Sequence, residues 1–370
     1  MKKILSVFGT RPEAIKMAPL VKAIEHDGEL EGVVCVTAQH REMLDQILNF
    51  FDIQPDYDLN IMTQRQTITD VTVKVLTGIE NILKEVRPDV VLVHGDTTTT
   101  FCAALAAFYQ QIPVGHVEAG LRTWNLYSPY PEEFNRQAVG RIAEYHFAPT
   151  EGARQNLLKE GKTRNVFVTG NTAIDALKFT VKSDFRHPLT EWAKGKRLIL
   201  LTAHRRENLG EPMRHMFRAI RRIAEEHDDI RVLYPIHKNP AVRETAHEIF
   251  GNGDIIRLVE PMDVFEFQNI MAKSYLVLTD SGGIQEEAPS LGVPVLVMRD
   301  TTERPEGIEA GTLRLVGTDE EKIYTAFREL LEDRASYDKM AHAVNPYGDG
   351  RASARIVAVL KHGSFETVKR

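Results

Sequence analysis

Cysteine is scarce in this sequence: Cys35 and Cys102 are the only two among 370 residues. Two cysteines cannot build the disulfide framework of a small secreted domain, and both lie in apolar stretches, Cys35 in a predicted strand and Cys102 in a predicted helix. We therefore interpret both as small buried hydrophobic side chains, and we expect a reduced, cytoplasmic protein.

Long apolar runs and an excess of basic residues are missing as well. No stretch approaches the roughly 20 apolar residues of a transmembrane helix. The apolar run near the start stops at Gly9, and Arg11 and Glu13 follow, so we interpret it as the first strand rather than as a signal peptide. The 46 Lys and Arg residues are outnumbered by 52 Asp and Glu residues. The net charge of −6 argues against broad binding to nucleic acid or anionic membranes.

Signals for a metal or a dinucleotide are also lacking. The histidines show no H-E-x-x-H or other tight ligand spacing, so the sequence supports no metal site. No G-x-G-x-x-G follows the first predicted strand, so the sequence signals no dinucleotide cofactor. We expect neither a metal nor a cofactor.

Predicted strands and helices alternate along the whole chain, which indicates βαβ units around mostly parallel sheets. Because 370 residues exceed the size at which one core stops growing, we expect two domains. We place them at residues 1–180 and 181–349, with a final helix in 350–370 that packs back on the first. The charged segment Lys182–Lys196 lacks periodicity and is interpreted as the linker. The predicted fold class is α/β, with two Rossmann-like domains and a cleft between them.

Three carboxylates mark the first predicted domain. Asp96 follows the apolar run Val90–Val93, Glu118 follows Pro113–Gly115, and Glu132 lies on a Pro-rich loop that enters a helix. Ligands of open α/β sheets bind at the carboxyl ends of the strands, so these groups should share one crevice. Clustered carboxylates raise one another's pKa, which suits acid/base chemistry. Taken singly, Asp96 could equally cap a helix and Glu132 could be a favourable first-turn residue. At successive strand ends, the functional interpretation is favoured.

The first strand also ends in charged residues. Thr10 and Glu13 have the spacing of a capping box, which explains both structurally. Helix structure does not explain Arg11 or Lys16. Cations at a strand end would suit an anionic ligand, and solvated surface charge is the alternative.

The second half contains a candidate phosphate seat. A predicted strand leads into Ser281-Gly282-Gly283 and then a helix, where glycine allows close backbone approach and the helix start presents N–H groups. Glu287, about a turn and a half further on, could hold ribose hydroxyls. The alternative is an ordinary tight turn with a serine cap.

His204 ends the first predicted strand of the second domain. A lone histidine at such a place is usually structural. Because Arg205 and Arg206 follow it, and because it belongs to the half with the phosphate seat, we interpret it as part of an anion clamp.

Together these residues closely resemble the non-hydrolysing UDP-N-acetylglucosamine 2-epimerase family. The matching blocks run from Phe8 to Ser353: FGTRPEAIK, TAQHREML, HGDTTTT, HVEAGLRT, PEEFNR, TAHRREN, TDSGGIQEEAPSLGVPVL, TTERPE and NPYGDGRAS. The resemblance implies a glycosyltransferase-B-like architecture, a homodimer, and reversible interconversion of UDP-GlcNAc and UDP-ManNAc without an external redox cofactor. It also implies a supply of ManNAc for cell-surface polysaccharide.

The resemblance further implies roles for individual residues. Those expected to bind the UDP-sugar are Arg11, Lys16, His204, Ser281, Gly282, Gly283, Glu287 and Arg304, with Phe267 near the base and Met262 in the loop near the uracil. Those expected to serve the sugar chemistry are Asp96, Glu118, Glu132 and His204. Bacterial members are activated by UDP-GlcNAc at an adjoining site, for which the matching candidates are Gln39, Arg65, Arg205 and His237.

The chemistry explains why such a site needs carboxylates. The C2 hydrogen of the sugar is not next to a carbonyl and is not acidic, so we expect the C1–O bond to break before or together with proton removal. UDP would leave, 2-acetamidoglucal would form, and a proton would return to the other face of C2 before UDP re-adds. Two faces require two proton-handling groups, and the sequence does not assign acid and base among the three carboxylates.

Three alternatives remain open at this point. A glycosyltransferase of the same architecture would also need the phosphate seat. A hydrolysing 2-epimerase would release free ManNAc. A non-catalytic UDP-sugar sensor would bind the nucleotide but would not need clustered carboxylates.

Overall fold

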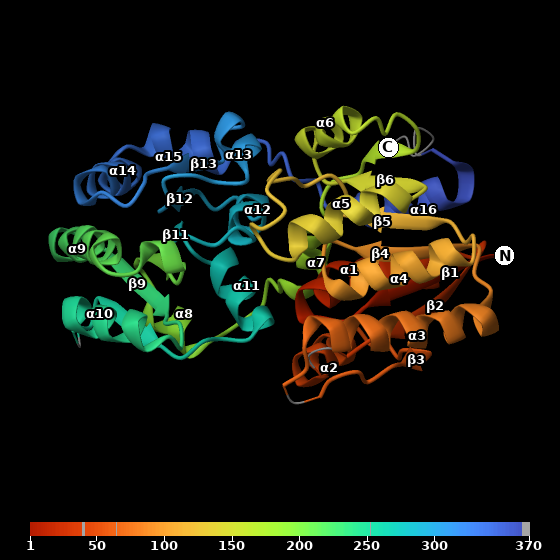
Figure 1. The fold of residues 1–370 in the computed structure, drawn as a ribbon. Coiled ribbons are helices and arrows are strands. Elements are labelled where there is room, and N and C mark those ends of the chain that lie inside the picture. Colours follow the sequence, from red (N-terminus) through yellow and green to blue (C-terminus); the bar gives the residue numbers. More distant parts are fainter. Residues whose placement is uncertain (39–40, 64, 252, 365–370) are drawn as a thin grey trace. The chain divides into compact units, whose positions relative to one another are not determined.

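The structure is a computed structural model, and it describes residues 1–38, 41–63, 65–251 and 253–364. The chain divides into two compact units (Figure 1). Unit 1 comprises Met1–Phe179 and the segment that begins at Tyr347, and unit 2 comprises Thr180–Pro346.

Unit 1 is built on a seven-stranded parallel sheet in the order β3-β2-β1-β4-β5-β6-β7. The strands are β1 (Lys2–Phe8), β2 (Leu30–Val36), β3 (Tyr57–Asp58), β4 (Val90–His94), β5 (Val114–Val117), β6 (Tyr145–Ala148) and β7 (Val166–Val168). The helices are α1 (Arg11–Glu25), α2 (Arg41–Phe50), α3 (Ile68–Val86), α4 (Thr98–Tyr109), α5 (Glu132–Ile142), α6 (Glu151–Lys159), α7 (Thr172–Thr180) and α16 (Ala352–His362).

Unit 2 is built on a six-stranded parallel sheet in the order β10-β9-β8-β11-β12-β13. The strands are β8 (Arg197–Thr202), β9 (Ile230–Pro235), β10 (Ile256–Val259), β11 (Leu276–Thr279), β12 (Val295–Val297) and β13 (Leu313–Leu315). The α-helices are α8 (Pro188–Trp192), α9 (Glu211–Glu226), α10 (Pro240–Phe250), α11 (Val264–Ala272), α12 (Ile284–Ser290), α13 (Pro305–Glu309), α14 (Glu320–Glu332) and α15 (Arg334–Ala341), and a 3₁₀ turn spans Arg206–Asn208.

Both sheets reverse their winding direction beside their first strand, between β1 and β4 in unit 1 and between β8 and β11 in unit 2. Open α/β sheets bind ligands at such a switch point, beyond the carboxyl ends of the strands. The central strands consist mostly of apolar residues, because helices cover both faces of the sheet and most side chains of these strands are buried. All five residues of β4, for example, are buried. Ligand-binding residues are therefore expected in the loops after β1, β4, β8 and β11.

The segment that follows unit 2 completes unit 1. Helix α16 packs on α1, and the Lys2 ammonium donates to the Leu360 carbonyl oxygen (3.0 Å). The carboxylate of Asp175 in α7 accepts from the N–H groups of Ala352 (3.1 Å) and Ser353 (2.8 Å). The first N–H groups of α16, which have no partner within the helix, are therefore hydrogen-bonded within unit 1.

The interpretation of residues 182–196 as a linker is wrong. This segment forms α8, and Phe185, Leu189 and Trp192 pack against the apolar core of unit 2. The Arg257 guanidinium also lies over the Trp192 ring, 4.4 Å from its centroid. A helix of five residues is too short to show a 3.6-residue period, so its apolar contacts left no periodic pattern.

The expectations about the two cysteines and about the start of the first helix are confirmed. Cys35 and Cys102 are buried free thiols in β2 and α4. Thr10 and Glu13 form a capping box at the start of α1. In the part of the chain that the structure describes, no helix combines the length and the apolar character needed to span a bilayer.

Candidate active site

The ends of β4 and β5 bring Asp96 and Glu118 close together in unit 1. The Gly95 N–H donates to the Val117 carbonyl oxygen (2.9 Å), which continues the ladder between the strands by one residue. Gly95 has a φ of +67°, and a Cβ built there would lie 3.5 Å from Glu118 Oε2. Asp96 and Glu118 therefore follow directly from two adjacent strand ends, as the sequence predicted.

Asp96 lies in an environment that opposes its ionisation. Its pKa is raised to about 6, chiefly by burial, with Glu118 and Glu132 acting in the same direction and Arg136 and Lys16 in the other. An Arg136 guanidinium nitrogen lies 3.2 Å from Asp96 Oδ2. Both glutamates therefore lie close enough to Asp96 to act on its ionisation.

Asp96 is not the helix cap that the alternative interpretation required. Thr97 occupies the N-cap of α4, and its hydroxyl accepts a hydrogen bond from the Thr100 N–H (3.1 Å). The Asp96 side chain is 30% exposed and has no capping role. Helix capping therefore does not explain why an aspartate stands at this position.

Glu118 is held by polar side chains from three elements. Its Oε1 atom pairs with the Lys16 ammonium of α1 and accepts from Asn171 Nδ2 (3.0 Å), just before α7. His94 Nε2, at the end of β4, lies 4.0 Å from Oε2. The backbone φ of Glu118 is +63°, a conformation that costs a residue with a Cβ roughly 1–2 kcal/mol. Unit 1 therefore maintains local strain at this carboxylate.

The adjacent residues Glu132 and Glu133 have different environments. Glu133 is fully buried, and its carboxylate accepts from the N–H groups of Thr123 and Trp124, each at 3.0 Å. Burial acts to raise the pKa of Glu133, but its hydrogen bonds, first that from Gln137, hold it below its usual value. The half-buried Glu132 side chain makes no hydrogen bond or ion pair with any residue whose position the structure describes. Glu133 is therefore a structural anchor, whereas Glu132 is available for chemistry.

In unit 2, one buried carboxylate joins the loops after β8 and β11. Asp280 follows β11, and its Oδ2 atom accepts from the N–H groups of His204 and Arg205, each at 2.8 Å. It also accepts from Asn208 Nδ2 (3.2 Å). Asp280 therefore fixes His204 next to Ser281, and thus next to the predicted phosphate seat.

The His204 ring lies between two polar neighbours. Its Nδ1 atom is 3.4 Å from Asp280 Oδ1, and the ring stacks on that of His237 with centroids 5.3 Å apart. Burial lowers the pKa of His204, and Asp280 partly opposes this effect. A ring held in this way can donate a hydrogen bond to an anionic group from the ring nitrogen that carries the proton.

The Ser281-Gly282-Gly283 turn leads into α12, and Gly283 is the N-cap. The alternative that the Ser281 side chain caps this helix is wrong, because no side-chain hydrogen bond caps α12. The Ser281 N–H donates to Thr279 Oγ1 (2.9 Å). The Arg304 guanidinium lies against Gly282, where a Cβ would be 2.8 Å from its Nη1 atom. Glycine at this position allows the arginine to reach the turn.

Two acidic residues in the first turn of α12 are already engaged. Glu286 Oε1 accepts from Arg304 Nε (2.6 Å), and Glu287 Oε2 accepts from Gln268 Nε2 (2.9 Å) in α11. Phe267, next to Gln268, and Met262 pack partly buried against the core of unit 2. The candidate ribose-binding and base-binding residues therefore lie on neighbouring elements.

Some of the remaining predicted residues lie next to residues already described, and others do not. Arg11 begins α1 and is half-buried. Of the candidates for an activator site, Arg205 and His237 adjoin His204, whereas Arg65 is exposed in the loop before α3 with a φ of +57°. Gln39 lies outside the described residues.

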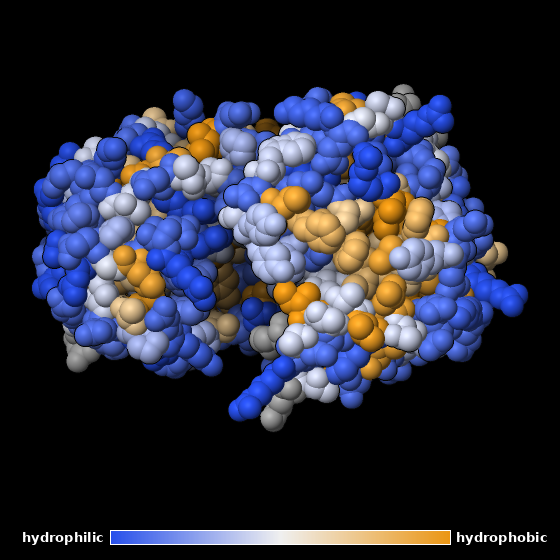
Figure 2. All heavy atoms as spheres, in the orientation of Figure 1, coloured by the Kyte–Doolittle hydropathy of each residue, from blue (hydrophilic) through white to orange (hydrophobic). Residues whose placement is uncertain are grey.

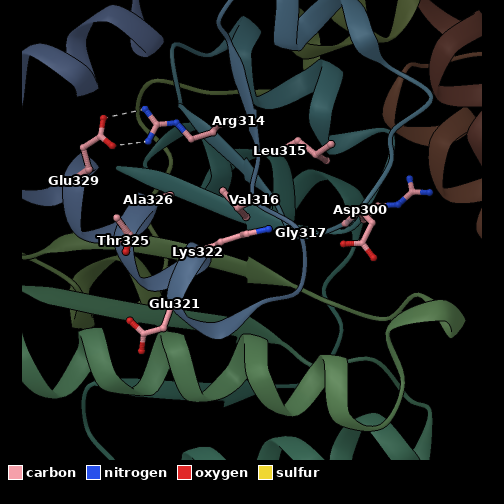
Figure 3. Close-up of a pocket in the computed structure, with 11 residues that line it drawn as sticks. Asp300, Arg314, Leu315, Val316, Gly317, Glu321, Lys322, Thr325, Ala326 and Glu329 are labelled. Carbon is pink, nitrogen blue, oxygen red and sulfur yellow. Dashed lines mark hydrogen bonds and ion pairs between the residues drawn. The ribbon is translucent and has the colours of Figure 1, made fainter.

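A cavity of about 600 Å³ in unit 2 adjoins β13 and the start of α14 (Figure 3). Its arginines already have acidic partners. Arg314 donates two hydrogen bonds to Glu329 (2.7 and 3.0 Å), and Arg299 donates two to Glu303 (2.8 and 3.1 Å). Both arginines that line the cavity are therefore already paired with a carboxylate.

Comparison with known proteins identifies the family. The family model for UDP-N-acetylglucosamine 2-epimerase matches residues 22–361. A UDP-N-acetylglucosamine 2-epimerase of Bacillus subtilis is 61% identical over 97% of this chain and 94% of its own length. The chain belongs to the non-hydrolysing UDP-N-acetylglucosamine 2-epimerase family.

Solved structures of similar proteins agree with this 2-epimerase assignment. S. aureus MnaA, in a co-structure with UDP, is 55% identical with a TM-score of 0.89 and covers 98% of this chain and 97% of its own. A Neisseria meningitidis UDP-GlcNAc 2-epimerase bound to UDP-GlcNAc is 48% identical with a TM-score of 0.85 and covers 97% and 99%. The predicted fold class, with two Rossmann-like α/β domains of glycosyltransferase-B-like type, is confirmed.

As a member of the 2-epimerase family, the protein is an enzyme of the isomerase class. Among its described residues, no group of three or more His, Cys, Asp or Glu side chains is placed to hold a metal ion. Arg136, Asn171, Asp280 and Glu286 were not predicted, although each contacts or positions a candidate residue. Only the pairing of strand ends and helix starts in space identifies them, since no local motif marks their partners.

Proposed function

We propose that this epimerase reversibly converts UDP-GlcNAc to UDP-ManNAc by eliminating and re-adding UDP through 2-acetamidoglucal. The observation that carries the proposal is the cluster of Asp96, Glu118 and Glu132, in which burial and like charge raise the pKa of Asp96 to about 6. A nucleotide-binding protein without proton transfer chemistry would have little use for such a cluster. The B. subtilis and N. meningitidis relatives carry the 2-epimerase name, and the latter was solved with UDP-GlcNAc.

In this proposal, cations and backbone N–H groups stabilise the departing diphosphate. The C1–O bond breaks with its electrons on UDP, so negative charge develops where Arg11, Lys16, His204 and Arg304 are expected to bind, together with the Ser281–Gly283 turn. Lys16 is paired with Glu118 before substrate binds. A diphosphate that draws Lys16 away would make Glu118 a stronger base, because a nearby cation favours the ionised carboxylate.

The proton inventory of the proposed reaction balances without a cofactor. One carboxylate removes the C2 proton as UDP leaves, and the C1=C2 double bond of 2-acetamidoglucal forms. A second carboxylic acid delivers a proton to the opposite face of C2, and a UDP oxygen attacks C1. A group whose pKa is near 6 can either donate or accept close to neutral pH, which suits Asp96 to either step.

Incubation of the enzyme with UDP-GlcNAc in heavy water tests this proposal. NMR should show UDP-ManNAc with deuterium at C2, and the recovered UDP-GlcNAc should acquire deuterium as well. Product without deuterium at C2 would exclude elimination and re-addition. Free ManNAc in the mixture would instead indicate a hydrolysing enzyme, and absence of turnover without an acceptor would favour a transferase.

Regulation and assembly form part of the same proposal. UDP-GlcNAc would also activate the enzyme at a site near Arg65, Arg205 and His237, with Gln39 as a further candidate. Pure UDP-ManNAc should then fail to react until UDP-GlcNAc is added, whereas hyperbolic kinetics in both directions would contradict activation. The enzyme would act in the cytoplasm and supply ManNAc units for cell-surface polysaccharide.

We infer a homodimer formed through the face of α3, α4 and α5. These helices pack side by side, and Figure 2 shows apolar side chains gathered over α3 and α4. Val73, Phe108 and Phe134 are among the exposed large apolar side chains of this face. Apolar patches of this kind typically mark interaction surfaces.

A further inference from the structure

The carboxylate of Glu118 depends on a side chain outside every motif of the sequence. Asn171 Nδ2 donates to Glu118 Oε1 (3.0 Å), the oxygen that also pairs with Lys16. Asn171 is only 3% exposed. We propose that Asn171 is a positioning residue that keeps Glu118 ionised and correctly oriented for proton transfer at C2. This inference rests on the proposed function, in which Glu118 handles that proton.

The orientation of the Asn171 amide is fixed by its second hydrogen bond. Asn171 Oδ1 accepts from the Ala173 N–H (2.9 Å) in the first turn of α7. The amide oxygen and nitrogen can exchange places only by rotation, and rotation would set the NH₂ group against that N–H donor. The group that faces Glu118 is therefore an N–H donor, which stabilises the ionised carboxylate over the protonated one.

The backbone of Asn171 is fixed by the segment that returns to unit 1. Its N–H donates to the Tyr347 carbonyl oxygen (2.7 Å). Gly170 and Gly348 cross beside it with φ values of +89° and +141°, and a Cβ on Gly170 would lie 3.2 Å from the Gly348 Cα. Such close contact between two backbones leaves Asn171 little freedom to move. Its donor is therefore held ready for Glu118 before substrate binds.

Three charged or titratable groups near Glu118 would not replace this donor. Lys16, from α1, is the group expected to turn toward the diphosphate, and the electrostatic effect of Asp96, at the end of β4, opposes ionisation. Burial holds the pKa of His94, also at the end of β4, at about 4, so its ring is neutral near pH 7. Asn171 is a partner that remains when Lys16 moves.

Asn171→Asp tests the inference with little change in shape. An Asp oxygen can still cap α7, but a carboxylate replaces the N–H donor beside Glu118. We expect kcat to fall at least about tenfold with KM within about twofold, and the acid limb of the kcat/KM profile to move up by about one pH unit, since one unit corresponds to a tenfold change in proton affinity. Asn171→Ser, which keeps a capping oxygen but adds no charge, should lower kcat with a smaller shift of the acid limb.

A matched control is available in unit 1. Asn165 Nδ2 also donates to a glutamate, Glu144 Oε1 (2.9 Å), at an exposed position. Asn165→Asp makes the same chemical change away from Glu118 and should leave kcat, KM and the pH profile as in the wild type.

Each result with the two Asn171 variants either supports or overturns the positioning role. Wild-type kcat and acid limb in both Asn171 variants would overturn the positioning role while deuterium at C2 of the wild-type product still supports the proposed function. Absence of that deuterium would instead remove the function on which the inference rests. Loss of folding in both variants, measured by thermal melting, would make Asn171 purely structural and would also overturn the inference.

Discussion

Neighbouring glutamates at the start of α5 show how strongly the environment of a residue decides its task. Glu133 is buried among four donors, from Thr123, Trp124, Gln137 and Arg136, whereas Glu132 keeps its carboxylate without such partners in the described part of the chain. The sequence motif PEEFNR presents both residues equally. Only the direction of each side chain on the helix distinguishes them.

Exchanging each glutamate for glutamine should separate these two tasks. Glu132→Gln should lower kcat by roughly 10²–10⁴, the usual contribution of a general acid or base, and leave the melting temperature unchanged. Glu133→Gln should lower the free energy of unfolding by about 1–3 kcal/mol, because the new NH₂ group must face N–H donors. Steady-state kinetics and urea unfolding measure the two effects. The reverse pattern would show that Glu133 is the reactive residue.

The raised pKa of Asp96 predicts opposite effects on stability and activity. Its folded pKa of about 6 lies above the ordinary value of about 3.9. Between these pH values the folded state binds more protons than the unfolded state, so this group adds stability as the pH falls and destabilises the ionised fold at pH 7. Asp96→Asn should therefore raise the free energy of unfolding at pH 7 by on the order of 1 kcal/mol while activity is lost.

Urea unfolding of wild type and Asp96→Asn at several pH values checks this prediction. The advantage of the variant should be present at pH 7 and should shrink as the pH falls through 6 toward 4. An advantage that grew on acidification would contradict the sign of the pKa shift.

At the scale of elements, the loop after β5 packs directly on α6. Gly120 has a φ of +92°, and a Cβ placed on it would lie 2.2 Å from the Ala153 carbonyl oxygen, a backbone atom that cannot move aside alone. This glycine thus sets how closely the loop that carries Glu118 approaches the helix.

Gly120→Ala should destabilise unit 1 by more than about 3 kcal/mol, because a steric clash is added to backbone strain. Gly161→Ala is a suitable control, since its φ of +79° is similar but a Cβ there meets nothing within 4 Å. The control should cost only about 1–2 kcal/mol, the price of the left-handed conformation. Equal losses in urea unfolding would show that contact with Ala153 is unimportant.

Elements marked by an apolar run or by a capping box could be predicted from the sequence, and a short element without such a mark could not. The apolar run Val90–Val93 lies in β4, and the capping box expected at Thr10 and Glu13 begins α1. Helix α8 was taken for linker because one or two turns give no measurable period.

Some residues of the candidate site could be predicted from the sequence, and others could not. Asp96 and Glu118 could be predicted because the carboxyl ends of adjacent parallel strands must meet. Asn171, Asp280 and Arg136 could not, because their partners are set by how closely loops pack after folding. Their amide, carboxylate and guanidinium groups are common in loops and helices, so residue type alone gives no signal.

At the scale of the whole molecule, the apolar face of α3 to α5 predicts an oligomeric state. Val73, in the second turn of α3, is 59% exposed, so a charge there should cost the isolated chain little. In a dimer the same charge would be buried at a high cost in desolvation. The variant Val73→Glu should therefore weaken or abolish dimerisation without unfolding the chain.

Sedimentation of Val73→Glu measures this effect against Val344→Glu. Val344 belongs to unit 2 and is 84% exposed, so the same substitution falls on none of the helices α3, α4 and α5. We expect a shift to monomer for the first variant and wild-type sedimentation for the second. A dimer that tolerates Val73→Glu would exclude this face as its interface.

The return of the chain into unit 1 has a consequence for biosynthesis. Tyr347, which fixes the backbone of Asn171, and α16, which covers α1, are both translated after all of unit 2. When the last residue of unit 2 is added during translation, unit 1 therefore still lacks one helix and the anchor behind Glu118. The N-terminal half is begun first but finished last, so a nascent chain arrested within unit 2 lacks both the backbone partner of Asn171 and the helix that covers α1.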